Sequence, residues 1–169
     1  MKLHIGGEEI KDDWKILNIQ KKNGVDFVGD ITDLSQFTDC SISEVYASHV
    51  FEHVKQNDIK KTLRGIHRVL KKGGKFYVSV PDMEILFKGF IDPKAPYKVK
   101  LHIMQMIFGG QTDQFDFHYF GWSQDFLKSF LLEAGFIEIK RVKSFLLFND
   151  TSDYAPYGAP ISLNIIANK

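Results

Sequence analysis

The fold class of this chain is decided by two stretches of sequence, SEVYASHVFEH at 43–53 and LKKGGKFYVSVPD at 70–82. Each contains an apolar run of strand length that ends in polar residues, and an amphipathic helical pattern lies between them. Two strands joined by a helix run parallel, because the chain must cross back over the sheet. Ligands of open α/β sheets bind beyond the carboxyl ends of the strands, which here carry Ser48, His49, Pro81 and Asp82. The stretches therefore predict an α/β fold and the sheet edge that binds a ligand.

Other short apolar segments bounded by turn residues predict further strands. With the two above, the expected strands cover residues 2–6, 15–20, 25–28, 44–48, 75–80, 136–142 and 161–167. Only about nine residues separate the first two strands, fewer than the dozen or so of a normal crossover. A full helix does not fit there, so we expect the first crossover to be shortened.

The helix between the two opening stretches has the clearest pattern. Ile59, Leu63, Ile66 and Leu70 form one apolar stripe at helical spacing, and Gly73-Gly74 supplies a left-handed exit. The basic residues of this segment lie largely away from the stripe, which favours a solvated face over a binding patch. Further helices are expected at 83–90 and 97–108 and after the N-cap residue Ser123.

The composition is that of an ordinary globular protein. The 169 residues carry a formal net charge of +1, which gives no electrostatic case for a nucleic acid or an anionic membrane as partner. No apolar stretch approaches the length of a membrane span, and the N-terminus lacks the apolar core of a signal peptide. Cys40 is the single cysteine, so no internal disulfide can form. We expect one cytoplasmic domain over residues 1–169.

Several strand ends carry residues that suit a ligand. Gly6-Gly7 would let a ligand approach the backbone closely, although a plain turn explains them equally well. Gln20 stands where an acidic residue usually binds ribose hydroxyls, and it lacks the charge-assisted bond of a carboxylate. Asp30 suits an adenine amino group or the N-terminus of the following turn.

A histidine motif and a loop histidine raise two further possibilities. Residues 49–53 fit H-x-x-E-H, in which two histidines on one helix share a zinc ion. The segment that leads into His49 reads as a strand, so we predict that His49 and His53 do not hold zinc and that the chain has no metal site. His118 lies on an expected loop, as a base or as a polar group without chemical role.

These pieces together resemble the class I S-adenosylmethionine-dependent methyltransferases, and most of all a family of small predicted methyltransferases. Four blocks carry the resemblance, and a late helix-to-strand segment at 130–136 extends it over nearly the whole chain. The blocks are LHIGGE at 3–8, Asp13-Trp14 with Asn18-Ile19-Gln20, HVFEH at 49–53 and RVLKKGG at 68–74. The chain departs from the family pattern at Glu8, where a glycine is usual, and at Gln20.

The resemblance implies a Rossmann-like, doubly wound, mostly parallel sheet of seven strands with one antiparallel strand near the C-terminus. It implies methyl transfer from S-adenosylmethionine, with S-adenosylhomocysteine as product, to a small-molecule or glycan acceptor. The alternative is a binding or scaffold protein that kept the fold and lost turnover. The candidate cofactor site consists of Ile5, Gly6, Gly7, Glu8, Gln20, Asp30, Ile31, Ser48, His49 and His53.

The segment 83–122 is the expected acceptor side of the site and a moving lid. It leaves a strand at the ligand edge, and loops of this size tend to be functional or disordered. Its last part concentrates aromatic residues, which line a lid or simply pack over the sheet. The candidate catalytic residues are His118, Asp82 and His49.

Overall fold

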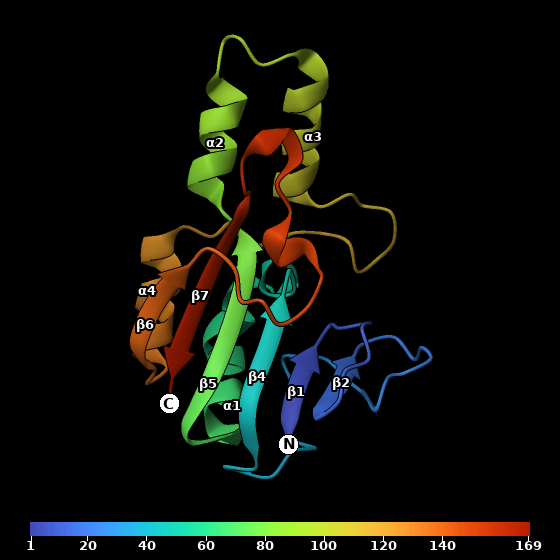
Figure 1. Cartoon of the computed structure of the whole chain (residues 1–169), viewed down its shortest axis with the longest axis vertical. Helices are drawn as coiled ribbons and strands as arrows, with labels where there is room; N and C mark the ends of the chain where they lie inside the picture. Colours follow the sequence, from blue (N-terminus) through green and yellow to red (C-terminus); the bar gives the residue numbers. More distant parts are fainter.

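The computed structural model describes residues 1–169 as one seven-stranded sheet with helices (Figure 1). The strand order is β3-β2-β1-β4-β5-β7-β6. The strands are β1 (Lys2–Ile5), β2 (Trp14–Asn18), β3 (Phe27–Val28), β4 (Ile42–Ser48), β5 (Leu70–Pro81), β6 (Ile137–Val142) and β7 (Ser162–Asn168). Strands β1 to β5 pair in parallel, whereas β7 runs antiparallel to both β5 and β6. The predicted mostly parallel sheet with one reversed strand near the C-terminus is confirmed.

The four α-helices match the helical segments expected from the sequence. They are α1 (Ile59–Val69), α2 (Met83–Ile91), α3 (Tyr97–Phe108) and α4 (Gln124–Glu133). Ser123 caps α4, as predicted, by accepting a hydrogen bond from the Phe126 amide. Helix α1 ends earlier than expected, at Val69, because Leu70 already pairs with Ile42 in the sheet. No helix is long and apolar enough to cross a membrane.

The helices cover only one face of the sheet. Helices α1 and α4 pack on one face, while α2 and α3 form a hairpin that projects beyond the carboxyl end of β5 (Figure 1). The crossover from β1 to β2, residues 6–13, contains no helix at all, and neither do the β2–β3 and β3–β4 connections. The first crossover is short, as expected, and the absence of a helix extends to all three connections in this half of the sheet.

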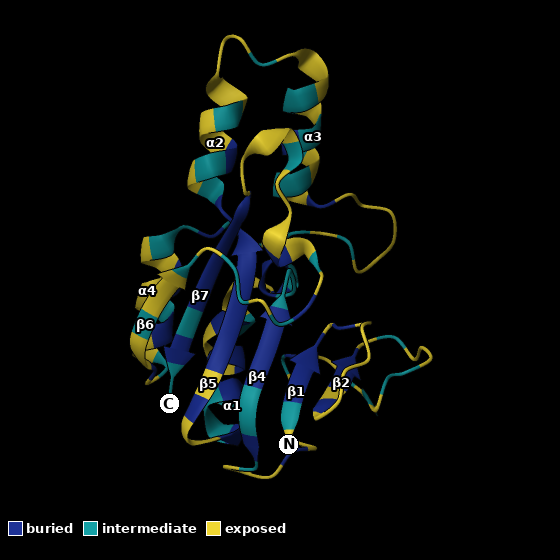
Figure 2. Ribbon diagram, viewed as in Figure 1, coloured by how far each residue is buried: buried dark blue, intermediate teal, exposed yellow.

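The main core lies between the sheet and helices α1 and α4. Alternate strand residues such as Leu3, Val45 and Phe76 point to this face, where they meet Leu63 and Leu131 of the helices. All five side chains are fully buried, and the strands that carry them are the darkest elements in Figure 2. At about 25 cal/mol per Å² of buried apolar surface, this layer is the main source of stability.

A long connection covers the opposite face of the sheet, where the other half of a doubly wound fold would place helices. Residues 143–161, between β6 and β7, cross in front of β4 and β5 (Figure 1). Phe148 of this segment packs on Trp14, Tyr46 and Tyr77, all of which point to this face. The Tyr46 hydroxyl donates a hydrogen bond of 2.8 Å to Asp150 and so anchors the segment to the sheet.

His4 lies within this aromatic layer and is almost fully buried. Its ring centroid is 4.0 Å from that of Phe148 and 5.0 Å from that of Tyr46. Burial lowers the pKa of His4 to about 4, although Asp150 and Glu9 act in the opposite direction. The imidazole is therefore neutral in the folded protein at pH 7. As the pH falls, it gains a proton in the unfolded chain before it does so in the folded protein.

We expect His4 to make the protein less stable in mild acid. Because the folded-state pKa is depressed, its contribution is complete above about pH 6.5 and is lost as the pH falls toward 4. The loss between about pH 7 and pH 5 should be roughly 2 kcal/mol. Urea unfolding of the wild type and of His4→Gln at both values measures it. The variant should lose less stability than the wild type over this interval, and parallel losses would contradict the assignment.

Candidate functional site

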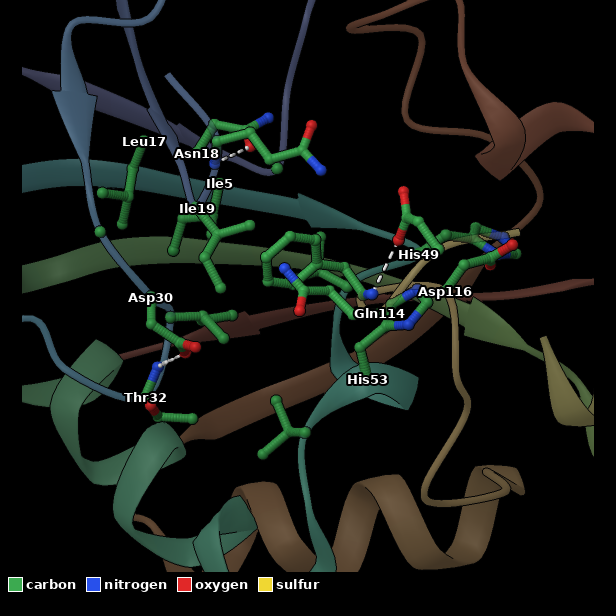
Figure 3. Close-up of a pocket in the computed structure, with 18 of the residues that line it drawn as sticks. Ile5, Leu17, Asn18, Ile19, Asp30, Thr32, His49, His53, Gln114 and Asp116 are labelled. Carbon is green, nitrogen blue, oxygen red and sulfur yellow. Dashed lines mark hydrogen bonds between the residues drawn. The ribbon is translucent and has the colours of Figure 1, made fainter. Parts of the chain in front are cut away.

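A cavity of about 720 Å³ opens beyond the carboxyl ends of β1, β2, β3 and β4. This is the edge at which parallel α/β sheets bind ligands. Most of the predicted cofactor residues line it, namely Ile5, Gly6, Glu8, Gln20, Asp30, Ile31, His49 and His53. Figure 3 shows Ile5, Leu17 and Asn18 on one side of the cavity and His53, Gln114 and Asp116 on the other. The structure thus brings together residues that lie more than a hundred positions apart.

The two glycines after β1 are required for different reasons. Gly6 lines the cavity with a φ of +75°, and a Cβ there would lie 2.5 Å from the Val50 side chain. Gly7, another predicted cofactor residue, does not line the cavity. A Cβ at Gly7 would meet the His4 ring at 2.4 Å, so this glycine serves the packing of the aromatic layer. A substitution of either glycine would disturb the fold as well as the site.

Two polar side chains follow from the end of β2: Asn18 is held by hydrogen bonds, and Gln20 is not. The Asn18 side-chain amide donates to the Gly7 carbonyl, and its oxygen accepts from the backbone N–H of Gln20. These bonds hold the loops after β1 and β2 together at the floor of the cavity. The Gln20 side chain lines the cavity and makes no hydrogen bond to the protein, so it is available to a ligand.

Asp30 and Glu8 both line the cavity and both have protein partners. One oxygen of Asp30 accepts a 2.8 Å hydrogen bond from the Thr32 amide, which confirms the turn-capping role. Its second oxygen has no such partner and remains free for a ligand. Glu8 forms an ion pair of 2.5 Å with Lys22 across the mouth of the cavity. This pairing gives the carboxylate, which departs from the family pattern, a partner within the chain.

A segment between α3 and α4 supplies the far wall of the cavity. Thr112, Asp113, Gln114, Phe115, Asp116 and Tyr119 line it. Phe115 and Tyr119 belong to the aromatic residues expected in this segment, whereas the polar residues could not be found from the sequence, because a polar loop without periodicity gives no sign of what it packs against. Burial alone would raise the pKa of Asp116, but hydrogen bonds from the Thr112 hydroxyl and backbone lower it. The wall therefore adds negative charge to the site.

His49 stands at the end of β4 in a left-handed conformation, with a φ of +52°. Few non-glycine residues adopt this conformation, and it turns the chain from the strand into the η1 3-10 helix (Phe51–His53). The Ser162 hydroxyl donates to the Thr151 carbonyl, so His49 Nε2 donates to Ser162 over 2.9 Å. His49 Nδ1 lies 3.1 Å from Glu52 Oε1, so that a protonated imidazole would form an ion pair with this carboxylate.

Glu52 is a fully buried carboxylate surrounded by three histidines. Burial by itself would raise its pKa, but His49, His53 and His118 lower it. The His53 and His118 rings meet edge to face with centroids 4.7 Å apart. Burial lowers the pKa of His118 despite the opposing effect of Glu52, so that this imidazole is neutral at pH 7. His118 contacts His53 but does not itself line the cavity.

Two predicted site residues have structural roles instead. Asp82 is buried, caps α2 by accepting from the Glu84 amide and forms a 2.6 Å ion pair with Arg141. It does not line the cavity. Ser48 also lies outside the cavity, because side chains alternate along β4 and Ser48 points to the same face as Tyr46.

Some aromatic residues at the end of the 83–122 segment pack over the sheet, and others line the cavity. Trp122 is fully buried and contacts Phe51 and Phe130, with Phe120 packed beside it. These residues belong to the core over the sheet. Phe115 and Tyr119, by contrast, are exposed and line the cavity.

Comparison with known proteins agrees with this arrangement. A family model described as a methyltransferase domain matches residues 8–78, which span β2 to most of β5. No curated protein matches the sequence. The matched region ends before the cavity wall at 112–119 and the reversed strand β7.

Several solved structures share the fold at low sequence identity. A SAM-dependent methyltransferase from Archaeoglobus fulgidus is 17% identical with a TM-score of 0.61, over 99% of this chain and 85% of that one. A SAM-dependent methyltransferase from Thermotoga maritima is 19% identical with a TM-score of 0.63, over 99% and 81%.

A third structure holds ligands. It is the 1,6-didemethyltoxoflavin-N1-methyltransferase of Burkholderia thailandensis with bound 1,6-didemethyltoxoflavin and S-adenosylhomocysteine. It is 14% identical with a TM-score of 0.62, over 99% of this chain and 69% of that one. These three structures show that the chain has the methyltransferase fold, and the methyltransferase-domain model matches residues 8–78 within it.

Proposed function

We propose that this protein transfers a methyl group from S-adenosylmethionine to a small-molecule or glycan acceptor. The observation that carries the proposal is the cavity at the carboxyl ends of β1 to β4, lined by most of the residues that the methyltransferase resemblance singled out. S-Adenosylmethionine supplies an electrophilic methyl group on a positively charged sulfonium. The cytoplasmic location and the absence of a nucleic-acid partner stay predictions from composition.

The lining of the cavity fits such a cofactor chemically. Five carboxylates and two lysines line it, Glu8, Asp30, Asp58, Asp113 and Asp116 against Lys22 and Lys55. This excess of negative charge suits a ligand that carries an ammonium and a sulfonium group. Gln20 and the free oxygen of Asp30 offer hydrogen bonds to ribose and adenine, as expected from the sequence. The rings of Phe115 and Tyr119 suit a sulfonium charge.

On the acceptor side, the chain supplies positioning and exclusion of water. The wall at 112–119 contacts His53, whose Nδ1 lies 3.1 Å from the Phe117 carbonyl oxygen, and an acceptor would lie beside this wall and His49. His49 lines the cavity with its Nδ1 3.1 Å from Glu52 Oε1, and it is the group best placed to exchange a proton with the acceptor. Holding donor and acceptor in line accounts for most of the rate enhancement that such a displacement requires.

A binding protein without turnover is the second candidate function. The chain has no helix after β1, so no helix N-terminus faces the cavity beside Gly6. This loss removes one common means of binding an anionic group. Calorimetry with S-adenosylhomocysteine and a methyl-transfer assay with labelled S-adenosylmethionine separate the candidates. Transfer into a small-molecule or glycan fraction supports the enzyme, binding without transfer supports the second candidate, and no binding overturns both.

The site itself is tested by filling the cavity at a residue that the fold does not need. Gln20→Trp should weaken binding of S-adenosylhomocysteine by at least roughly tenfold, or about 1.4 kcal/mol, because the side chain lines the cavity and has no protein partner. Gln105→Trp on the exposed face of α3 is the matched control. Equal affinities for the two variants would place the ligand elsewhere.

We expect a carboxylate at position 20 to improve binding. Gln20→Glu keeps the side-chain length and replaces a neutral hydrogen bond to ribose with a charge-assisted one. The gain should be about 1 kcal/mol, a factor of roughly five in the dissociation constant. Calorimetry measures it, with Gln105→Glu as the control for added charge. A loss of affinity would mean that the Gln20 amide donates to an acceptor group of the ligand.

We propose that the middle of the cavity wall is the part of the 83–122 segment that moves. Hydrogen bonds from Tyr119 and Phe120 to the Glu52 carbonyl tether the end of the segment, whereas residues 111–117 are mostly bonded among themselves. S-Adenosylhomocysteine should slow hydrogen exchange at residues 111–117 and leave residues 92–96 unchanged. Full protection of 111–117 before the ligand is added would contradict a moving lid.

A further inference from the structure

Three side chains at the edge of the cavity form a group with the composition of a metal site. Glu52, His53 and His118 each offer one ligand atom, and these atoms all lie within 4.8 Å of one another. Glu52 and His53 come from the η1 turn after β4. His118 is brought to them by the hydrogen bond of the neighbouring Tyr119 amide to the Glu52 carbonyl, 2.7 Å long.

The backbone engages one ring nitrogen of His53. His53 Nδ1 lies 3.1 Å from the Phe117 carbonyl oxygen and donates to it. The backbone of Met106 also acts on the His118 ring, in the direction that raises its pKa. The other nitrogen of His53, Nε2, forms no hydrogen bond and is left to coordinate an ion. Metal-binding histidines are typically held in this way, with the second nitrogen on a carbonyl or carboxylate.

The Glu52 carboxylate lacks the partners that a buried charge requires. It is 1% exposed, and neither oxygen accepts a hydrogen bond of good geometry. The nearest donor is His49 Nδ1, which satisfies at most Oε1 and is itself held by Ser162. An uncompensated buried carboxylate is costly, and packing alone gives no reason for it at this position. A cation beside the free oxygen would remove this cost.

We infer that Glu52, His53 and His118 bind a divalent transition-metal ion. Metal–ligand bonds of about 2.0–2.2 Å require only a small inward movement of the three groups. Two imidazoles and one carboxylate favour Zn²⁺ or Fe²⁺ over Mg²⁺ or Ca²⁺, which prefer oxygen ligands. This site is distinct from the His49–His53 pair of the H-x-x-E-H motif, because His49 faces Glu52 rather than the metal position. It also revises the expectation that the chain has no metal site.

Three protein ligands leave coordination positions open, as in catalytic rather than structural metal sites. His53 belongs both to the group and to the lining of the cavity, so an open position adjoins the acceptor space. An oxygen atom of the acceptor would bind there, and the metal would lower the pKa of an acceptor hydroxyl. This second step rests on the proposed function, whereas metal binding does not.

Metal binding is tested on the whole purified chain after removal of metal with a chelator. Titration with Zn²⁺ should show one site, and Co²⁺ should give the visible absorption of a nitrogen-coordinated ion. His118→Ala and Glu52→Gln should each weaken Zn²⁺ binding by about 100-fold or more, at or beyond the upper end of the loss caused by removing a supporting residue. His102→Gln, which removes a histidine outside the group, is the matched control.

The outcomes separate this inference from the proposed function. Circular dichroism and the affinity for S-adenosylhomocysteine without metal report whether each variant is folded, and His53→Asn replaces Glu52→Gln if that variant does not fold. No stoichiometric Zn²⁺ in the wild type, or the same affinity in His118→Ala, would overturn the site. An equal loss of Zn²⁺ affinity in His102→Gln would also overturn the site, because it would indicate that surface histidines bind the ion.

The open coordination position has its own probe. Acetohydroxamate, a small oxygen-donor chelator, should change the visible spectrum of the Co²⁺-loaded wild type. An unchanged spectrum at saturating acetohydroxamate would show that the metal position is closed to an acceptor oxygen. Neither measurement depends on methyl transfer, so both keep their meaning if S-adenosylhomocysteine does not bind.

Discussion

The short crossover between β1 and β2 is the constraint on which the rest of the structure depends. Residues 6–13 must return the chain to the start of a neighbouring parallel strand, and they are too few to contain a helix. The two following connections contain no α-helix either, so one face of the sheet has no helical cover. The buried apolar surface that a helix would provide must come from elsewhere, because a central sheet cannot leave a face of tyrosine and tryptophan side chains in water.

The β6–β7 connection provides this cover and at the same time shapes the site. Phe148 completes the aromatic layer over Trp14 and Tyr46, and Asp150 ties the segment to the Tyr46 hydroxyl. The same segment ends beside Ser162, whose hydroxyl fixes the His49 ring. The β6–β7 connection, which covers the sheet in place of helices, is thus linked through Ser162 to His49 at the edge of the cavity. A substitution in this connection is therefore expected to change the position of the His49 ring.

Residues 49–53 direct the path of the chain and also supply titratable side chains at the edge of the cavity. The left-handed His49 turns the chain out of β4, and the Glu52 carbonyl tethers the cavity wall through the Tyr119 amide. The Glu52 carboxylate gathers His49, His53 and His118 around one buried charge. Such a concentration of titratable groups at a strand end is typical of functional sites, since packing alone would favour apolar residues there.

The sequence by itself determined the parallel sheet, the helices, the strand ends that carry the ligand site and most residues of that site. These features follow from local periodicity and from the rule that parallel strands end at one edge, so Gly6, Gln20, Asp30 and His49 could be found without coordinates. Only the tertiary structure decided that Asp82 pairs with Arg141 and that residues 112–116 form a wall of the cavity. It alone also placed His118 beside Glu52 and His53. These contacts join segments far apart in the chain, and no local pattern records which polar loop will lie against which strand end.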